Sequence, residues 1–148
     1  YTKHDYEKCP ETIEQESEGV AVHTCPGLGG HNVLWIQEVD ATSVQFDKRV
    51  LESWLDIGNF FEVGTTIEWR GPTRSGALQP VAAIVRYQVS ESVGGPTTTR
   101  LLIYRLEANA FCVMAVVKGG PGDNEKARAI VDAKAEAFAC GRSQRIEE

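Results

Sequence analysis

The clearest strand pattern in this sequence lies in the stretch Val81-Ala82-Ala83-Ile84-Val85-Arg86-Tyr87-Gln88-Val89, and the rest of the fold is predicted around it. Its odd-numbered residues are all apolar or aromatic, whereas Arg86 and Gln88 fall on the opposite side. Side chains of a strand point alternately to the two faces of a sheet, so this pattern predicts a strand with one buried face. Residues 99–106 alternate in the same way. The glycine-containing residues 90–96 between them predict a β-hairpin with a long loop.

Further strands are predicted on both sides of this hairpin. The β-branched and aromatic residues 65–70 favour a strand before it. The almost wholly apolar residues 111–117 predict a central strand that is covered on both faces. Three shorter alternating segments predict strands nearer the N-terminus, at 20–23, 33–39 and 43–46. Together these segments predict one strongly bent antiparallel sheet.

Two helices are predicted from apolar residues at helical spacing. A short one over 47–58 would present Val50, Leu51, Trp54 and Leu55 on one face. A longer one over 122–140 has start signals at 121–124 and a stop at Gly141. Its apolar stripe must cover an apolar surface, and the sheet is the candidate. The stripe consists of Ala127, Ile130, Val131, Ala135 and Phe138.

The predicted fold class is α+β, with a bent antiparallel β-sheet and a C-terminal helix packed on it. The 148 residues fit a single domain over 1–148. Within it we expect an acidic N-terminal arm at 1–18, mainly β-structure over 19–117 and the helix at 122–140. The run of acidic side chains in the arm is typical of a solvated face or a loosely held segment. An arm that docks on a basic partner is the alternative.

The composition is that of an ordinary globular protein and excludes several classes. Hydrophobic residues make up 42% of the chain and charged residues 24%, which argues against a disordered protein. The formal net charge of −6 argues against a nucleic-acid-binding surface, because phosphates would be repelled. No run of about 18 uncharged apolar residues occurs, so no membrane-spanning helix is predicted.

Four cysteines fall into two groups near the two ends of the chain: Cys9, Cys25, Cys112 and Cys140. Four cysteines allow three pairings, and sequence alone does not choose between them. We favour Cys9–Cys25 and Cys112–Cys140, because each disulfide closes a short loop between elements expected to be neighbours. Disulfides are typical of an oxidising compartment, which predicts a periplasmic or secreted protein. Four free thiols in a cytosolic protein are the alternative. The chain starts at Tyr1 without an apolar leader, as expected after removal of a signal peptide.

No metal, cofactor or catalytic residue is predicted. His23, Cys25 and His31 form a metal-like cluster, but the spacing matches no specific zinc pattern and a disulfide would occupy Cys25. The chain lacks a G-x-S-x-G elbow, and the glycine-rich turn at 27–30 lacks the Lys-Ser/Thr pair of a phosphate loop. A hydrolase whose carboxylates meet only in space is an alternative, with Glu38, Glu52, Glu62 and Glu68 as the acidic residues concerned.

The candidate binding residues are Trp69, Arg70, Arg86 and Arg105. On neighbouring strands the three arginines would form a positive stripe on an acidic protein. Such a stripe suits an anionic ligand or a partner that presents carboxylates. The alternative is that the arginines form cross-strand ion pairs with Glu68 and Glu107. Filling of the core is the corresponding alternative for the aromatic residues, Trp69 among them.

Four segments of the chain resemble a group of small exported bacterial proteins of uncharacterised function: residues 14–19, Cys25-Pro26-Gly27, residues 64–70 and residues 79–86. The four-cysteine layout and the alanine-rich last helix are similar too. The resemblance implies a periplasmic or secreted location and transfers no catalytic residue. Small periplasmic lysozyme inhibitors share size, export and disulfides with this chain, but only as an analogy of class.

The resulting functional hypothesis is an exported, non-enzymatic module that binds a protein or a cell-envelope component. The absence of an assembled catalytic signature motivates this hypothesis. The alternatives are a small periplasmic hydrolase that uses carboxylates, and an inhibitor of an envelope-degrading enzyme. A protruding loop at 90–97 would favour a binding protein, whereas a pocket with converging acidic or histidine side chains would favour an enzyme. No oligomeric state is predicted.

Overall fold

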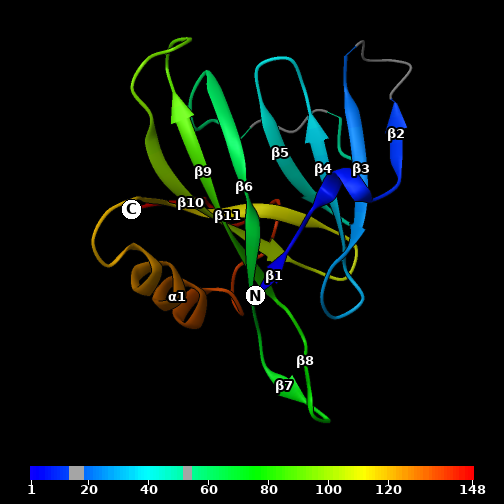
Figure 1. Ribbon diagram of the computed structural model, residues 1–148. Coiled ribbons are helices and arrows are strands. Elements are labelled where there is room, and N and C mark those ends of the chain that lie inside the picture. Colours follow the sequence, from blue (N-terminus) through cyan, green and yellow to red (C-terminus); the bar gives the residue numbers. More distant parts are fainter. Residues whose placement is uncertain (14–18, 52–54) are drawn as a thin grey trace.

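A six-stranded sheet, sheet A, is the central layer of the computed structural model, which describes residues 1–13, 19–51 and 55–148 (Figure 1). Its strands lie in the order β1-β6-β9-β10-β11-β12, and all neighbours are antiparallel except β11 and β12. The predicted hairpin is formed by β9 and β10. The strands are β1 (Thr2–Lys3), β6 (Phe60–Arg70), β9 (Ala82–Ser90), β10 (Thr98–Leu106), β11 (Phe111–Lys118) and β12 (Ile146–Glu147).

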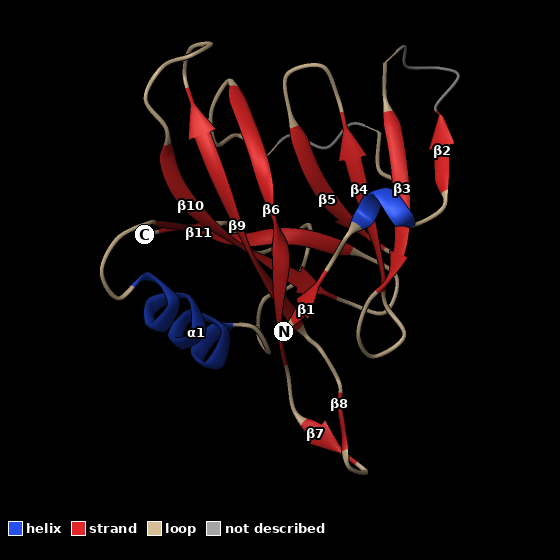
Figure 2. Cartoon of the chain, in the orientation of Figure 1, coloured by secondary structure: helices blue, strands red, loops and turns tan. Residues whose placement is uncertain are grey.

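A second antiparallel sheet, sheet B, packs on one face of sheet A (Figure 2). Its four strands are β2 (Glu11–Ile13), β3 (Ala21–Pro26), β4 (Asn32–Gln37) and β5 (Thr42–Phe46), in that order. The prediction of one bent sheet is therefore wrong, because alternation indicates which side chains are buried but not which strands pair. The α+β class is confirmed only in outline: the described residues form a mainly antiparallel β-structure with one α-helix near the C-terminus.

Two apolar cores lie between the layers. The larger lies between the sheets and includes Trp35 and Phe46 of sheet B with Tyr87 and Tyr104 of sheet A. The smaller lies on the other face of sheet A and includes the buried face of the helix. β9 and β10 are the central strands of sheet A. The strand predicted at 111–117 is β11, which lies between β10 and the two-residue strand β12 and contributes side chains to both cores, as predicted for a strand covered on both faces.

One α-helix, α1 (Asp123–Lys134), covers the smaller core (Figure 1). Val131 is buried, as the predicted stripe requires, but the helix ends six residues earlier than predicted. Two bonds hold the following residues in a turn: Arg105 donates to the carbonyl of Phe138, and Cys140 is joined to Cys112. The Phe138 ring nevertheless stays in the core, with 8% of its surface exposed. Within the described ranges, no helix has both the length and the apolar character needed to cross a membrane.

Both disulfides are present in the pairings favoured from the sequence. Cys9 and Cys25, whose Cα atoms are 5.3 Å apart, join the N-terminal segment to β3. Cys112 and Cys140, with Cα atoms 5.7 Å apart, join β11 to the turn that follows α1. No cysteine among the described residues is free. Each disulfide therefore ties a segment near one end of the chain to a sheet.

The N-terminal segment 1–13 packs against the rest of the protein while Asp5, Glu7 and Glu11 stay exposed, which fits the predicted solvated face and not the loosely held segment. It contains β1, a short 3₁₀ helix η1 (Tyr6–Lys8) and β2. The Tyr6 ring stacks on Trp35 with centroids 5.3 Å apart, and Thr2 accepts a hydrogen bond from the Trp69 indole. These contacts and the Cys9 disulfide hold the segment against both sheets. Residues 14–18 of the predicted arm lie outside the described residues.

Two segments between the main strands differ from the predictions. The loop expected at 71–76 contains a short hairpin of β7 (Thr73–Arg74) and β8 (Ala77–Leu78), which projects beyond the end of β6 (Figure 1). The short helix expected over 47–58 includes residues 52–54, which lie outside the described residues. The described residues on either side, 47–51 and 55–58, are not helical. Leu55 still contributes to the larger core, so its predicted burial is confirmed.

Candidate binding cleft

Strand register brings Arg70 and Arg105 together at one end of sheet A. Ala82, the first residue of β9, pairs with Arg70 of β6 on one side and with Arg105 of β10 on the other. The two arginines therefore flank the same residue on the face that α1 covers. Arg86 lies four residues farther along β9, roughly 13 Å away at the rise of a β-strand. The three predicted arginines consequently do not form one continuous stripe.

A cleft of about 480 Å³ lies beside Arg70 and Arg105, between the β7–β8 hairpin and α1. We call it the hairpin–helix cleft and define it by the residues that line it. Its apolar and glycine lining consists of Trp69, Gly71, Pro72, Leu78, Val81, Val131 and Ala135. Its charged lining consists of Arg70, Arg74, Arg105, Asp132 and Glu136. The volume falls within the range that is usual for ligand sites in proteins.

The base of the hairpin is tightly packed, which fixes one wall of the cleft. A Cβ atom on Gly71 would lie only 1.9 Å from the carbonyl oxygen of Gln79, so only glycine permits this approach of the two chains. Gln79 donates a backbone hydrogen bond of 2.8 Å to Pro72, and Val81 donates another of 2.8 Å to Arg70. The wall is thus built by backbone contacts rather than by flexible side chains.

Arg70 is largely neutralised by two carboxylates. Its Nη1 donates to Glu68, 3.1 Å away on the same strand, and its Nη2 donates to Asp132 on α1, 3.2 Å away. Its buried Nε has no hydrogen-bond partner among the residues that the structure describes. Arg70 thus pairs with Glu68 along one strand and not across two strands as expected, and it forms a second ion pair with Asp132 on the helix. Arg70 links the floor of the cleft to its helical wall.

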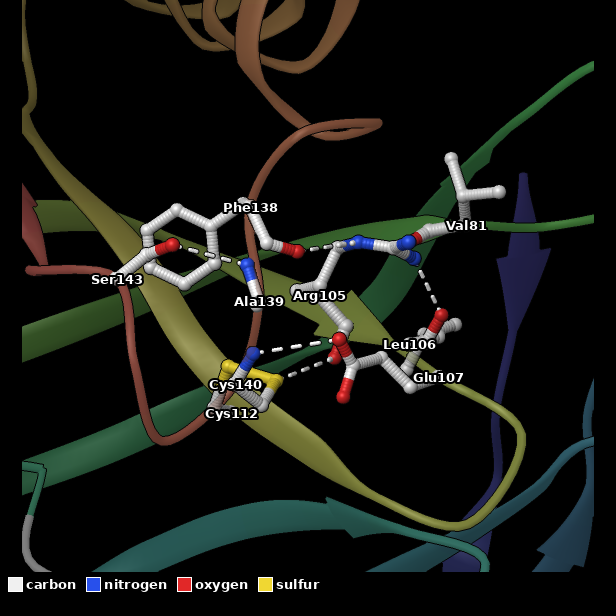
Figure 3. The surroundings of a disulfide bond; sticks show 9 residues. All are labelled: Val81, Arg105, Leu106, Glu107, Cys112, Phe138, Ala139, Cys140 and Ser143. Carbon is white, nitrogen blue, oxygen red and sulfur yellow. Dashed lines mark hydrogen bonds between the residues drawn. A yellow bond between two sulfur atoms is a disulfide. The ribbon is translucent and has the colours of Figure 1, made fainter.

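Arg105 is held by three backbone carbonyls instead of a carboxylate (Figure 3). It donates to Val81 at 2.9 Å, to Leu106, and through Nε to Phe138 at 3.3 Å. The expected ion pair with Glu107 does not form, because Glu107 instead accepts the backbone N–H of Cys140, 3.2 Å away. Carbonyl groups orient a guanidinium but carry no net charge. The carbonyls therefore do not neutralise the positive charge of Arg105 beside the cleft.

Arg86 serves a different purpose, away from the cleft. Its guanidinium makes two hydrogen bonds to Asp123 at the start of α1, of 3.0 and 3.3 Å, and one of 3.1 Å to Asn124. Hydrogen bonds from Arg86 hold the pKa of Asp123 below its ordinary value. Arg86 therefore anchors the beginning of the helix to β9 and is not a cleft residue.

Trp69 contributes to the cleft while most of its ring belongs to the larger core. It is buried, its ring meets Phe46 edge-on with centroids 5.7 Å apart, and its indole N–H donates to Thr2 at 2.8 Å. Gly27 lies against the ring, because a Cβ atom there would come within 2.8 Å of it. Trp69 is thus chiefly a core residue, which was the alternative weighed for it, and it also reaches the cleft lining.

Two exposed charged residues of the cleft, Arg74 and Glu136, were not identified from the sequence. Arg74 stands on the hairpin, which was expected to be an irregular loop. Glu136 follows Asp132 by one helical turn, in the polar half of the predicted helix. Neither has an ion-pair partner within the described parts of the chain. Only the Gly71-Pro72 and Ser75-Gly76 pairs, as turn signals, could have indicated a hairpin here.

The three residues of the metal-like cluster, His23, Cys25 and His31, are each held by other bonds. Cys25 forms a disulfide, and His23 contacts the carbonyl of Cys9 at 3.2 Å and the carboxylate of Glu11 at 3.0 Å. His31 instead pairs with Asp47, 2.7 Å away. Three or more potential metal ligands do not come together anywhere in the described ranges.

Glu68, one of the acidic residues considered for a hydrolase, is committed to ion pairs. Burial alone would raise the pKa of Glu68, but hydrogen bonds from Arg128, Tyr1 and Arg70 outweigh it and hold the pKa below its ordinary value. Arg128 approaches the carboxylate with both Nε, at 2.8 Å, and Nη2, at 3.0 Å. A carboxylate held ionised in this way is suited to pairing with a cation and not to donating a proton. Glu52 lies outside the described residues.

The loop after β9 exposes an apolar side chain at the other end of sheet A. Gly95 donates a backbone hydrogen bond of 3.1 Å to Ser92 and closes a turn with Val93 at its tip. Val93 has 84% of its surface exposed. Asn59 donates to the carbonyl of Glu91 at 3.1 Å and so fixes the base of this loop to the start of β6. The loop therefore presents Val93 on an ordered support.

The chemistry available in the hairpin–helix cleft is recognition of a ligand that is partly apolar and partly charged. Its apolar side chains can cover a hydrophobic group, and its guanidinium groups can bind an anion. Its one carboxylate from the helix itself, Asp132, is already paired with Arg70. Comparison of the chain with protein families, with curated proteins and with solved structures finds no match.

Proposed function

We propose that this protein is an exported, non-enzymatic binding module that holds part of a partner protein in the hairpin–helix cleft. The observation that carries the proposal is the cleft itself: a concave site of about 480 Å³ that combines an apolar lining with arginine side chains. Known ligand sites in proteins have volumes in this range and combine an apolar lining with a few polar or charged groups. A partner segment with an apolar side chain and a negative charge would satisfy both parts of the lining.

The two disulfides support a location outside the reducing cytosol. Each joins segments that are 16 or 28 residues apart in the sequence, and both would be reduced or slow to form in the cytosol. A periplasmic or secreted protein is the proposal that fits them. A partner would then be another exported protein or a protein component of the cell envelope.

The bonding of the acidic residues supports binding over hydrolysis. The helix carboxylate in the cleft, Asp132, is 3.2 Å from Arg70, and Glu68 is held ionised by its partners. A carboxylate-based hydrolase needs one group that keeps its proton near neutral pH, and neither of these two residues has an environment of that kind.

The proposal is tested with the tagged mature protein as bait in cell-envelope extract of the producing organism. Leu78→Asp adds a carboxylate to the cleft lining, and Asn109→Asp adds one to an exposed turn elsewhere as a matched control. We expect a partner that the wild type and Asn109→Asp retain and that Leu78→Asp loses. Equal retention by all three proteins, at equal melting temperature, would contradict a role for the cleft.

A second candidate function, inhibition of an envelope-degrading enzyme, rests on the Val93 loop. An exposed apolar side chain on an ordered turn is the kind of group that can enter an enzyme's cleft with little loss of conformational entropy. Val93→Asp would then abolish inhibition of bacterial cell-wall hydrolysis, whereas Leu78→Asp would not. Unchanged hydrolysis in the presence of excess wild-type protein would contradict this candidate.

A further inference from the structure

The net charge of the hairpin–helix cleft restricts the kind of ligand that it can bind. Its lining contains three arginines and two carboxylates, which leaves a formal charge of +1. The rest of the chain is acidic, since the whole protein carries −6. A ligand with a single negative charge complements this site, whereas a doubly charged phosphate would leave an excess of negative charge beside Glu136.

The three arginines contribute differently to this charge. Arg70 is compensated by Glu68 and Asp132, at 3.1 and 3.2 Å. Arg105 keeps its charge but is fixed by three carbonyls, so it offers a stationary positive charge at the cleft. Arg74 is exposed and has no hydrogen-bond or ion-pair partner among the described residues. It is the cleft arginine whose donors are available to a ligand.

The apolar lining lies close to these charges. Leu78 pairs with Thr73, the residue before Arg74, and Val131 and Ala135 line the cleft from the helical side. Arg74 and Leu78 both line the cleft, so a bound molecule meets a guanidinium and an apolar side chain in the same site. Five of the twelve lining residues are charged, so a long acyl chain would lie against polar groups over much of its length.

We propose that the hairpin–helix cleft binds the C-terminus of a partner polypeptide, with the terminal carboxylate on Arg74 and the last, apolar side chain against Leu78 and Val131. This inference rests on the proposed function of the cleft and names its ligand. A chain terminus supplies one carboxylate and one apolar group at the spacing of a single residue. Capture of a terminal carboxylate is a recurring mode of peptide recognition. Arg74 is then the residue that determines specificity.

The experiment uses the full chain and three probes: acetyl-Gly-Ala-Leu with a free carboxylate, the same peptide as its C-terminal amide, and decanoate. Each is titrated into ¹⁵N-labelled protein and followed by NMR. We expect the free acid to shift the amide signals of Leu78, Val131 and Ala135, and to bind at least about tenfold more tightly than the amide. Equal affinity for acid and amide, no shift at millimolar acid, or tighter binding of decanoate would overturn the proposal.

Substitutions separate the role of Arg74 from general charge effects. Arg74→Glu is expected to lose the preference for the free acid, whereas Arg142→Glu, at an exposed arginine outside the cleft, is expected to keep it. Arg74→Lys should recover part of the preference, because it restores the charge without the planar pair of donors. If the peptide arms fail while Leu78→Asp still abolishes partner retention, the cleft functions in binding but its ligand is not a chain terminus.

Discussion

The hydroxyl oxygens of Tyr87 and Tyr104 lie 2.6 Å apart, fully buried between the two sheets. The Tyr87 hydroxyl also accepts the backbone N–H of Val44, 3.2 Å away on sheet B. A polar group buried without a partner costs about 1–3 kcal/mol. This short chain of hydrogen bonds therefore gives the two hydroxyls and the Val44 N–H a partner where sheet B packs on sheet A.

Replacing Tyr87 is expected to be more costly than replacing Tyr104. Tyr87→Phe leaves both the Val44 N–H and the Tyr104 hydroxyl without a partner, whereas Tyr104→Phe affects the Tyr87 hydroxyl alone. At about 1–3 kcal/mol for each orphaned group, Tyr87→Phe should lower the free energy of unfolding by roughly 1 kcal/mol more than Tyr104→Phe. Urea denaturation of the two variants measures this difference. The reverse order would show that Val44 finds another acceptor.

The same pair predicts loss of stability at alkaline pH. Burial raises the pKa of Tyr87 to about 12 and raises the pKa of Tyr104 well above its ordinary value. A pKa raised in the folded state means that the stabilisation is complete below about pH 10 and declines as the pH rises towards the folded value. Absorbance of tyrosinate should therefore show two tyrosines that ionise only when the protein unfolds. Their ionisation in the folded protein near pH 10 would contradict this burial.

At acidic pH the ion pairs between sheet A and α1 are expected to weaken. The pKa of Glu68 is held below its ordinary value, because hydrogen bonds from Arg128, Tyr1 and Arg70 outweigh the effect of burial. A pKa lowered in the folded state gives stabilisation that is present above the unfolded value and lost as the pH falls through the folded value. Glu68→Gln should therefore reduce the fall in unfolding free energy between pH 5 and about pH 3. An unchanged pH profile would mean that Glu68 does not contribute to it.

Removing the Cys112–Cys140 disulfide should destabilise the protein and loosen one wall of the cleft. The bond closes a loop with a sequence separation of 28, for which chain entropy predicts about 3–4 kcal/mol. In Cys112→Ala/Cys140→Ala, the amides of residues 135–141 should exchange faster with deuterium than those of α1.

The wild type, unfolded without reductant, should show no reactive thiol. Detection of four reactive thiols would show that neither disulfide is formed, and the support for an oxidising compartment would be lost.

Phe138→Ala tests whether the turn after α1 is part of the smaller core. The ring is 8% exposed and packs with residues of β9, β10 and β11. Truncating a buried phenylalanine typically costs about 3–5 kcal/mol, so a loss of that size is expected. A loss below about 1 kcal/mol in thermal or urea denaturation would mean that the ring faces solvent.

The strands of sheet A could be predicted because burial leaves a pattern in them. Residues 82–89 alternate between the larger core and the helix-covered face, and residues 101–106 do the same, whereas Val81, predicted on the side of Ala83, packs with the helix-covered core. The division into two sheets could not be predicted, because it depends on which strands pair, and alternation is the same for either partner. Strands of two or three residues, such as β1 and β12, are too short to carry any pattern.

The candidate site was only partly accessible from the sequence. Arg70 and Arg105 were chosen because arginines on the polar face of neighbouring strands could form a positive stripe, and the register through Ala82 places these two together. Arg86 has the same sequence signal, but the start of α1 lies beside it and supplies Asp123. Arg74 and Glu136 became candidates only through the hairpin and the helix position, which depend on long-range packing.

The most direct test of the account is a comparison of photo-crosslinking from two positions. A benzophenone amino acid is placed at Leu78 in the hairpin–helix cleft or at Asn109 in the exposed turn after β10, and the protein is irradiated in cell-envelope extract. We predict one dominant adduct from position 78 that unlabelled wild-type protein displaces and unlabelled Leu78→Asp does not. Adducts of equal yield from both positions, or none from position 78, would contradict a binding role for the cleft.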